Sequence, residues 1–308
     1  MLLSREYSTP TLIILVGLSG SGKSTYAKQK KDTELDKNWN IVSSDSIREE
    51  LCGNCEDQSK NKEVFEIFHK RIKSLLSERQ NVIADATNLT IKYRRAILDC
   101  ADNFPFFVIK QCIVFSKPFN YCRINNLERR HPAPQKVLDK QISNFQIPFL
   151  EEGFNSIMVH HLINEKRKQL SELLSVMTSF DQKNPHHKCT LDVHCSRVYT
   201  LMLSYILFEG FELGGLLHDV GKVFTQTLDE KDIAHYYNHE NYGSYFVLSQ
   251  LDRKDSELFN ICFLINYHML PFGWNTEKAK ERWKTTFGER KYNILREFHE
   301  IDAHVLWA

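Results

Sequence analysis

Several features that mark other classes of protein are missing from this chain of 308 residues. No stretch approaches the ~18 consecutive apolar residues of a membrane-spanning helix, and the first residues lack the apolar core of a signal peptide. The eight cysteines are scattered. Cys52 and Cys55 form one isolated C-x-x-C with no second pair, which disfavours a zinc or disulfide framework. These absences predict a soluble cytoplasmic protein with reduced thiols and no membrane association.

The charge balance is equally uninformative about partners. The formal net charge is +1, so overall charge does not indicate a nucleic-acid binder. Divided near residue 163, the first part is mildly basic and the second mildly acidic. That asymmetry leaves polyanion binding open for the first half, and most of these charges are expected on solvated helix faces.

What the sequence does contain is a phosphate-binding loop at residues 17–24, reading GLSGSGKS. An apolar run, Leu12–Val16, precedes it as a buried parallel strand would, and a helix-forming stretch follows. In that setting backbone N–H groups surround a phosphate, Lys23 reaches the β- and γ-phosphates, and the Ser24 hydroxyl binds Mg²⁺. The chain is therefore expected to bind ATP or GTP. The predicted phosphate-binding residues are Gly17, Ser19, Gly20, Ser21, Gly22, Lys23, Ser24 and Thr25.

A second group of residues with metal-binding chemistry lies in the other half of the chain. Histidines and carboxylates recur there at wide spacing on segments that read as helices. Two adjacent ligand-type side chains after the apolar turn Leu216–Leu217 are costly to bury unpaired. Nitrogen and oxygen ligands in this mixture suit a divalent transition metal or Mg²⁺. The predicted ligands are His194, His218, Asp219, His239, His268 and Asp302.

The pattern of apolar runs predicts two domains of different class. The first half alternates apolar runs with amphipathic stretches, which indicates an α/β domain with a parallel sheet flanked by helices. After residue 163 no convincing strand remains, and an all-α domain is expected. The predicted strands are 12–16, 40–43, 81–84, 106–114 and 156–160. The predicted helices are 24–30, 63–76, 91–100, 136–150, 164–177, 192–208, 211–220, 242–251, 256–268, 276–286 and 291–306. The predicted domains are 1–163 and 184–308, joined by a connecting helix or linker at 164–183.

Polar residues at the ends of the predicted strands suggest a phosphoryl acceptor site. Asp45 and Arg48 follow the second strand, where a carboxylate can take the proton of an acceptor hydroxyl and an arginine can hold an acceptor phosphate. Helix capping by Asp45 is the alternative. Asp85 follows the third strand and could hold Mg²⁺-bound water or orient the acceptor, with Asn88 as a further acceptor contact or a turn former. An arginine-rich segment with Arg123 and Arg129 reads as a lid over ATP or as an exposed basic helix end.

Together these residues resemble the 5′-hydroxyl polynucleotide kinases of nucleic-acid repair. The resemblance rests on the phosphate loop, Asp45-x-x-Arg48, Asp85-x-Thr87-Asn88 and the arginine-rich segment ending at Pro134. It implies ATP-dependent phosphorylation of a 5′-OH end. The family lid commonly reads Arg-Asn-x-x-Arg, and here Asn125 stands in the first place. The resemblance therefore leaves open whether Arg123 or Arg129 contacts ATP.

The second half resembles the HD phosphohydrolase superfamily, an all-helical fold with a His…His-Asp…Asp pattern. Here His194, His218-Asp219 and Asp302 match it, and His239 and His268 match the extra ligands of dinuclear members. The resemblance implies one or two divalent metals (Mn, Ni, Co, Fe, Zn or Mg), with Asp219 as a bridging catalytic ligand. Lys222 would hold a substrate phosphate. His187 would bind phosphate or protonate the leaving oxygen, unless it only opens a helix.

The pairing implies a bifunctional enzyme that heals nucleic-acid ends, with RNA favoured over DNA. One site would phosphorylate 5′-OH ends using ATP and Mg²⁺. The other would hydrolyse 2′,3′-cyclic or terminal phosphates, and a separate RNA ligase is the partner implied. Two alternatives stay open: a nucleoside or nucleotide kinase fused to a nucleotidase, and a nucleotide-sensing regulatory protein.

Overall fold

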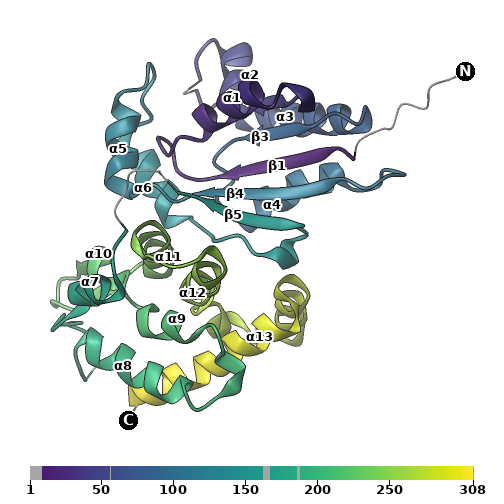
Figure 1. Cartoon of the computed structure of the whole chain (residues 1–308). Helices are drawn as coiled ribbons and strands as arrows, with labels where there is room; N and C mark the ends of the chain where they lie inside the picture. Colours follow the sequence, from purple (N-terminus) through teal and green to yellow (C-terminus); the bar gives the residue numbers. More distant parts are fainter. Residues whose placement is uncertain (1–8, 56, 162–166, 186–187, 308) are drawn as a thin grey trace, which may run out of the picture. The chain divides into compact units, whose positions relative to one another are not determined.

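The computed structural model describes residues 9–55, 57–161, 167–185 and 188–307, and the chain divides into two compact units. Unit 1 comprises Met1–Leu138 and Glu152–His161, and unit 2 comprises Asp139–Glu151 and Leu162–Ala308 (Figure 1). Among the described residues no helix combines the length and apolarity needed to cross a bilayer. The predicted fold class, a parallel sheet with flanking helices followed by a helical region, is confirmed.

Unit 1 is an α/β structure built on one parallel sheet in the order β2-β3-β1-β4-β5. Its strands are β1 (Thr11–Val16), β2 (Asn40–Ser43), β3 (Val82–Asp85), β4 (Ile109–Phe115) and β5 (Ser156–His160). Its helices are α1 (Lys23–Thr33), η1 (Leu35–Lys37), α2 (Ser44–Cys52), α3 (Asn61–Ser77), α4 (Ile91–Leu98), η2 (Asp99–Ala101) and α5 (Phe119–Leu127). The first residues of α6 (Gln135–Ser143) and the last residue of η3 (Leu150–Glu152) also belong to unit 1. The central strands are apolar and fully buried because helices cover both faces of the sheet.

Aromatic contacts show which helices lie on which strands. Tyr26 of α1 meets Phe115 of β4 edge-on at 5.6 Å and His160 of β5 at 5.0 Å. Phe65 of α3 stacks on Tyr93 of α4, with ring centroids 6.0 Å apart. In a parallel sheet the carboxyl ends of the strands meet at one edge, and the phosphate loop after β1 lies at that edge.

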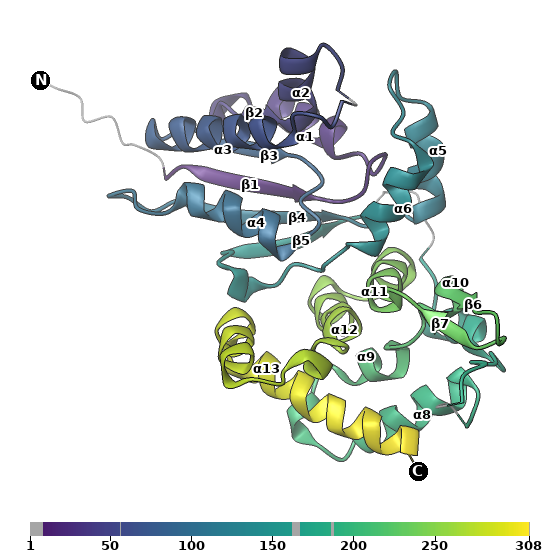
Figure 2. The ribbon, with the colours of Figure 1, turned by 180° about the vertical axis from the view of Figure 1, so that it is seen from behind.

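Unit 2 is mainly helical. Its elements are α7 (Leu170–Leu174), η4 (Ser175–Met177), α8 (Leu191–Met202), η5 (Ile206–Phe208), α9 (Glu212–Leu217), α10 (Lys222–Thr225), β6 (Gln226–Leu228), β7 (Ala234–Tyr236), α11 (His239–Gln250), α12 (Asp255–Tyr267), η6 (Leu270–Gly273) and α13 (Glu277–Trp307). Figures 1 and 2 both show the short helix α9 surrounded by α8, α11, α12 and α13. Its glycines permit this: a Cβ on Gly214 would lie 2.8 Å from the Cβ of Leu264.

The structure differs from the predicted elements at several places. The antiparallel hairpin β6–β7 lies in the half expected to contain no strands, because its strands have only three residues each and carry no measurable periodicity. The helix predicted at 136–150 ends at Ser143, and beyond it the Asn266 side chain bonds the N–H of Ile147 and the carbonyl of Phe145. The helix predicted at 164–177 begins at Leu170, where Gln169 and Glu172 form a capping box; residues 162–166 lie outside the described residues.

The two helices predicted at 276–286 and 291–306 are confirmed as the two arms of α13, which kinks at Gly288 (φ 74°). A positive φ cannot continue a helix and is tolerated by glycine. Gly288 therefore lies in the gap, residues 287–290, that separates the two predicted helices.

Segment Asp139–Glu151 belongs to unit 2 although unit 1 residues flank it in the sequence. Phe149 packs against Phe263, Tyr267 and Phe287 with centroid distances of 5.1–5.9 Å. The Tyr267 hydroxyl donates to the carbonyl of Ile147 at 2.8 Å. This excursion of the chain is not part of the predicted domain organisation, which stays a prediction.

Candidate functional sites

The glycine-rich loop joins β1 to α1 and folds back on its own backbone. The Gly17 N–H donates to the carbonyl of Thr87 at 3.0 Å, which ties the loop to the segment after β3. The Ser21 N–H donates to the Leu18 carbonyl at 3.2 Å. The ammonium of Lys23, the first residue of α1, donates to the same carbonyl at 2.8 Å. Successive N–H groups at a helix start, with a lysine among them, suit a phosphate.

Two positions of the loop require glycine. Gly20 and Gly22 have φ values of +79° and +99°, in the left-handed region. A Cβ on Gly20 would also lie 2.2 Å from the carbonyl oxygen of Cys122. The side-chain amide of Asn125 donates to the Gly20 carbonyl at 3.0 Å. Helix α5 therefore packs directly on the phosphate loop, a contact that any larger residue would prevent.

Lys23 and Asp85 are buried beside the loop, and the exposed Ser24 hydrogen-bonds to Asp85. Burial lowers the pKa of Lys23, although Asp85 opposes this shift. Burial raises the pKa of Asp85, while Lys23 and a hydrogen bond from Ser24 oppose it. A serine hydroxyl and a carboxylate are hard oxygen donors, so this pair fits the predicted Mg²⁺.

The carboxylate of Asp45 is held by two arginines. Arg48 Nη1 lies 3.2 Å from Oδ1, and Arg129 Nη2 lies 2.8 Å from Oδ2. Arg48 itself is 5% exposed and is fixed by the Asn61 side chain at 2.9 Å and the Cys55 carbonyl at 3.3 Å. Its Nε is buried and has no hydrogen-bond partner among the described residues. A buried guanidinium with unused hydrogen-bonding capacity can receive an anionic group.

The capping alternative for Asp45 is wrong, because Ser43 is the N-cap of α2 and accepts from the Ser46 N–H. Asp45 lies in the first helical turn, which leaves its carboxylate to the arginines. The two arginines of the arginine-rich segment have different partners. Arg129 donates to Asp45, whereas Arg123 donates from Nε to Gln135 at 2.9 Å.

Asn88 is the one predicted acceptor contact that has another role in the fold. It is 2% exposed, adopts a φ of +49°, and donates from its side chain to the Leu15 carbonyl at 2.8 Å. Its own carbonyl accepts from Arg94 at 3.2 Å. The Arg94 guanidinium in turn pairs with Glu152 at 2.7 and 2.8 Å, fully buried. Asn88 therefore braces the segment after β3 and its amide nitrogen is occupied.

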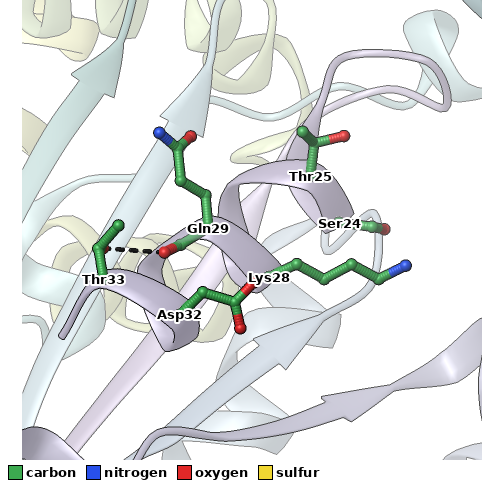
Figure 3. Close-up of a pocket in the computed structure, with 6 residues that line it drawn as sticks. All are labelled: Ser24, Thr25, Lys28, Gln29, Asp32 and Thr33. Atoms are coloured by element: carbon green, nitrogen blue, oxygen red, sulfur yellow. Dashed lines mark hydrogen bonds between the residues drawn. The ribbon is translucent and has the colours of Figure 1, made fainter. Parts of the chain in front are cut away.

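An open pocket of about 450 Å³ runs along α1 directly after the loop. Figure 3 shows its lining of Ser24, Thr25, Lys28, Gln29, Asp32 and Thr33, with the Thr33 hydroxyl donating to the Gln29 carbonyl. Ser24 and Thr25 belong both to this pocket and to the predicted phosphate-binding set. The pocket therefore opens beside the loop, with a lysine and an aspartate further along the helix.

In unit 2 the structure brings all six predicted metal ligands together. They come from α8 (His194), the turn after α9 (His218 and Asp219), the first residue of α11 (His239), the end of α12 (His268) and α13 (Asp302). They form two groups, each with ligand atoms within 4.8 Å of one another: His194, His218 and Asp302, and Asp219, His239 and His268. Residues up to 108 positions apart along the chain thus meet at one buried centre.

Asp219 lies between the two groups. Its Oδ1 is 3.1 Å from Nε2 of His239 and 3.7 Å from Nε2 of His268. Its Oδ2 is 3.3 Å from Nε2 of His218 and 3.8 Å from Nε2 of His194. One oxygen faces each group, which is the geometry required of a bridging carboxylate.

Three of the histidines are oriented by their own helices. Nδ1 of His218 lies 2.8 Å from the Gly215 carbonyl, Nδ1 of His239 2.8 Å from that of Tyr236, and Nδ1 of His268 2.8 Å from that of Ile265. A carbonyl only accepts, so each Nδ1 carries a proton, and Nε2 is the ring nitrogen that faces the centre. This backbone support is typical of metal-binding histidines. The donor set therefore fits one or two divalent metals.

The charged groups of this centre shift one another's pKa. Burial alone would raise the pKa of Asp219, but Lys222 and His218 hold it well below its ordinary value. Burial would lower the pKa of His218, but Asp219 and the other acidic neighbours raise it well above its ordinary value. Burial lowers the pKa of His268. So many charges in one buried place would be costly without a compensating ion or ion pairs.

Gly221 allows the elements to approach closely enough for this cluster. A Cβ there would lie 1.9 Å from the carbonyl of His239 and 2.7 Å from the N of Gly243. Both contacts are with the backbone of α11, which cannot move aside without displacing His239. Close packing against α11 therefore requires a glycine two positions after Asp219.

Lys222, predicted to hold a substrate phosphate, lies at the centre. Its Nζ is 2.6 Å from Oδ2 of Asp219 and 3.0 Å from Oε1 of Gln182. His187, the other predicted phosphate contact, lies outside the described residues.

Sequence reasoning missed the side chains that support these groups. Gln182, Asn61 and Asn125 each orient a site residue or loop through a contact distant in sequence. Cys195 was also missed, and its Sγ lies 3.7 Å from Nδ1 of His218, on the side away from the centre. Burial raises the pKa of the Cys195 thiol, which lies with His218 and Asp219 in a third group of potential ligands. No local pattern distinguishes such residues from ordinary polar side chains.

Comparison with known families assigns both halves of the chain. Residues 12–148 match the model of the AAA domain, and residues 191–300 match the model of the HD domain. The first span covers the phosphate loop, Asp45, Arg48 and Arg129. The second covers all the predicted metal ligands except Asp302, which lies just beyond it.

Two curated proteins are similar to the first half. A bifunctional polynucleotide phosphatase/kinase of Schizosaccharomyces pombe is 27% identical over 151 residues, which are 47% of this chain and 32% of that protein. An L-seryl-tRNA(Sec) kinase of Methanococcus maripaludis is 30% identical over 148 residues, which are 44% of this chain and 53% of that protein. The chain thus spans about a third to a half of these relatives.

Among solved structures, one of the Pnkp1/Rnl/Hen1 RNA repair complex is 27% identical over 44% of each chain, with a TM-score of 0.37. A gluconokinase from Sinorhizobium meliloti is 18% identical over 51% of this chain and 85% of that one, with a TM-score of 0.36. The family matches and the geometry of the two sites lead to one conclusion. The first part of the chain is similar to AAA domains, and the second part is similar to HD domains.

Proposed function

We propose that this protein heals both kinds of damaged end in a nucleic acid. One site phosphorylates a 5′-hydroxyl with ATP, and the other hydrolyses a 2′,3′-cyclic or a terminal 2′- or 3′-phosphate. The observation that carries the proposal is that one chain holds two separate constellations for phosphate chemistry. One is an acceptor carboxylate beside a phosphate loop, and the other is a buried centre of histidines and aspartates.

The residues of unit 1 suit transfer to a hydroxyl. Asp45 accepts the hydroxyl proton while the hydroxyl oxygen bonds to the γ-phosphorus and ADP leaves. Arg48, fixed by Asn61 and the Cys55 carbonyl, holds a phosphate of the acceptor strand. Lys23 and Arg129 stabilise the charge that develops on the transferred group. A phosphate next to the acceptor hydroxyl exists in an oligonucleotide and not in a free nucleoside.

The similarity to the bifunctional polynucleotide phosphatase/kinase supports the polynucleotide as the substrate. RNA is preferred over DNA here, because a 2′,3′-cyclic phosphate requires the 2′-hydroxyl of RNA. A separate RNA ligase is the partner that would use the 5′-phosphate and 3′-hydroxyl ends so produced.

The residues of unit 2 suit hydrolysis of a phosphoester. Divalent metals bound there would supply Lewis acidity and an activated water. The chain itself supplies the ligands, holds Asp219 with one oxygen toward each group, and keeps the histidine protons on Nδ1. Lys222 adds a positive charge for the substrate phosphate.

A single acceptor comparison tests the kinase half. The protein would be incubated with labelled ATP and Mg²⁺, and with a 5′-OH RNA, a 5′-OH DNA, the same RNA carrying a 5′-phosphate, or a mononucleoside. We expect label on the 5′-OH oligonucleotides, more on RNA, and none on the phosphorylated control. Label on the mononucleoside alone would contradict the proposal and support the nucleoside kinase alternative.

A second acceptor is favoured by one relative. The similarity to an L-seryl-tRNA(Sec) kinase makes a hydroxyl carried by an aminoacylated RNA the competing target. A serylated tRNA belongs in the same acceptor series. Label that is released from it with the amino acid, and absence of label at RNA 5′ ends, would favour this second activity. Nucleotide binding without transfer to any acceptor would instead favour the sensor alternative.

A further inference from the structure

A glutamine outside every helix and strand contacts the lysine of the metal centre. Gln182 belongs to the segment between η4 and α8 and is 1% exposed. Its Oε1 accepts from Nζ of Lys222 at 3.0 Å. Lys222 is 6% exposed, and its Nζ also lies 5.3 Å from the ring centre of Tyr236. Among the described residues, the oxygen partners of this buried ammonium include a charged one on Asp219 and a neutral one on Gln182.

The position of Gln182 is fixed on every side. Its Nε2 donates to the Cys189 carbonyl at 3.2 Å, and its own backbone carbonyl accepts from the Tyr236 hydroxyl. Gln226 donates both to that hydroxyl at 2.9 Å and to the Asp181 carbonyl at 3.1 Å. The amide nitrogen must face a carbonyl and the amide oxygen must face the ammonium, so only one orientation of the side chain fits.

We propose that Gln182 is a positioning residue of the HD site, which holds Lys222 where it can turn from Asp219 to a phosphate. The inference rests on the proposed function only in taking phosphate as the ligand. Oδ2 of Asp219, the oxygen that binds Lys222 at 2.6 Å, also faces His218 and His194. A metal at that oxygen would compete with the ammonium. Gln182 provides a second partner that keeps Lys222 in place after it leaves Asp219.

The chemistry requires a neutral acceptor at this position. A glutamate would give Lys222 two carboxylate partners, and their charges would cancel the attraction for a phosphate. An apolar residue would leave the buried ammonium short of one hydrogen bond, which is costly. An amide oxygen orients the ammonium and leaves its charge for the ligand.

Binding of inorganic phosphate to the Mn²⁺-loaded full-length protein tests the inference without an RNA substrate. We expect Gln182→Glu to raise the Kd for phosphate about tenfold or more, as expected for a lost charge-assisted contact. Binding of Mn²⁺ alone, measured by calorimetry, should be unchanged or tighter. Gln226→Glu is the matched control: it makes the same change one contact further from Lys222 and should leave phosphate binding near that of the original protein.

Phosphate binding that is unchanged in Gln182→Glu, or equally weakened in Gln226→Glu, would overturn the inference. Gln182→Met, which keeps the length and adds no charge, covers the case in which the glutamate variant does not fold. It should weaken phosphate binding while Mn²⁺ is retained, and unchanged binding would again overturn the inference. If the original protein binds phosphate in this Gln182-dependent way yet processes no RNA end, the proposed function fails and the inference stands.

Discussion

Both oxygens of Asp45 are hydrogen-bonded to arginines, Oδ1 to Arg48 and Oδ2 to Arg129. Arg48 is anchored by further partners in unit 1, whereas Arg129 follows α5 on the arginine-rich segment. The phosphates of ATP are the stronger competitor for that arginine. In the proposed mechanism, nucleotide binding would then free one oxygen of Asp45, and Arg129 would connect the two substrates.

Substitution of Arg129 tests that role. We expect Arg129→Ala to raise the KM for ATP and to reduce phosphoryl transfer about 10²–10³-fold, the usual cost of losing one transition-state donor. Arg123→Ala is the matched control, because Arg123 donates to Gln135 instead. Equal losses from the two variants would show that the segment contributes only general positive charge. Initial rates with varied ATP distinguish these outcomes.

At the scale of single residues, the sequence predicted those site residues that belong to short motifs. The phosphate loop, Asp45-x-x-Arg48 and His218-Asp219 are each read within a few positions, and the structure brings each group to a plausible site. Gln182 and Asn61 could not be predicted, because each acts on a residue 40 or 13 positions away. The sequence left Asn88 as either an acceptor contact or a turn former, and its burial and positive φ support a structural role.

At the scale of elements, close approach of the backbones decides whether the metal centre can form. The segment His218–Lys222 lies against the start of α11, and glycines at 221 and 243 face each other there. A Cβ on Gly243 would lie 3.0 Å from the N of Gly221. The distance between these elements sets where His239 lies relative to Asp219.

Gly221→Ala should therefore disturb unit 2 strongly. Its Cβ would meet backbone atoms at 1.9 Å, so α11 must shift, at a cost of about 1–3 kcal/mol or more. We expect a lower melting temperature and weaker Mn²⁺ binding. Gly273→Ala is the matched control, since nothing lies within 4 Å of a Cβ there and its φ is ordinary. Thermal unfolding and Mn²⁺ titration of both variants check this. Normal metal binding by Gly221→Ala would contradict the packing argument.

Most elements were predictable because their apolar periodicity is long enough to read. The five strands of unit 1 and helices such as α3, α11 and α12 lie within a few residues of their predicted bounds. The errors fall where tertiary contacts override local pattern. Lys168, placed in a helix by its amphipathic surroundings, instead pairs its backbone with residues 250–252. The segment after α6 is held extended because Asn266 bonds the backbone of Phe145 and Ile147.

At the scale of the whole molecule, the chain combines two chemistries with separate residues. The kinase-type site draws its residues from unit 1 and the metal centre from unit 2. Neither site needs a residue of the other for the roles described. The number of units was predictable from the change of periodicity near residue 163. The membership of Asp139–Glu151 was not, since its aromatic partners lie 100 or more residues further along.

Independence of the two activities is the central claim, and one measurement tests it most directly. An RNA carrying a 5′-hydroxyl and a 2′,3′-cyclic phosphate would be incubated with ATP, Mg²⁺ and Mn²⁺, and both ends analysed. Asp45→Asn should leave the 5′ end unphosphorylated and still open the cyclic phosphate, while Asp219→Asn should do the reverse. The two variants mixed should heal both ends. Loss of both activities from either variant, or an RNA left unchanged by the original protein, would contradict the account.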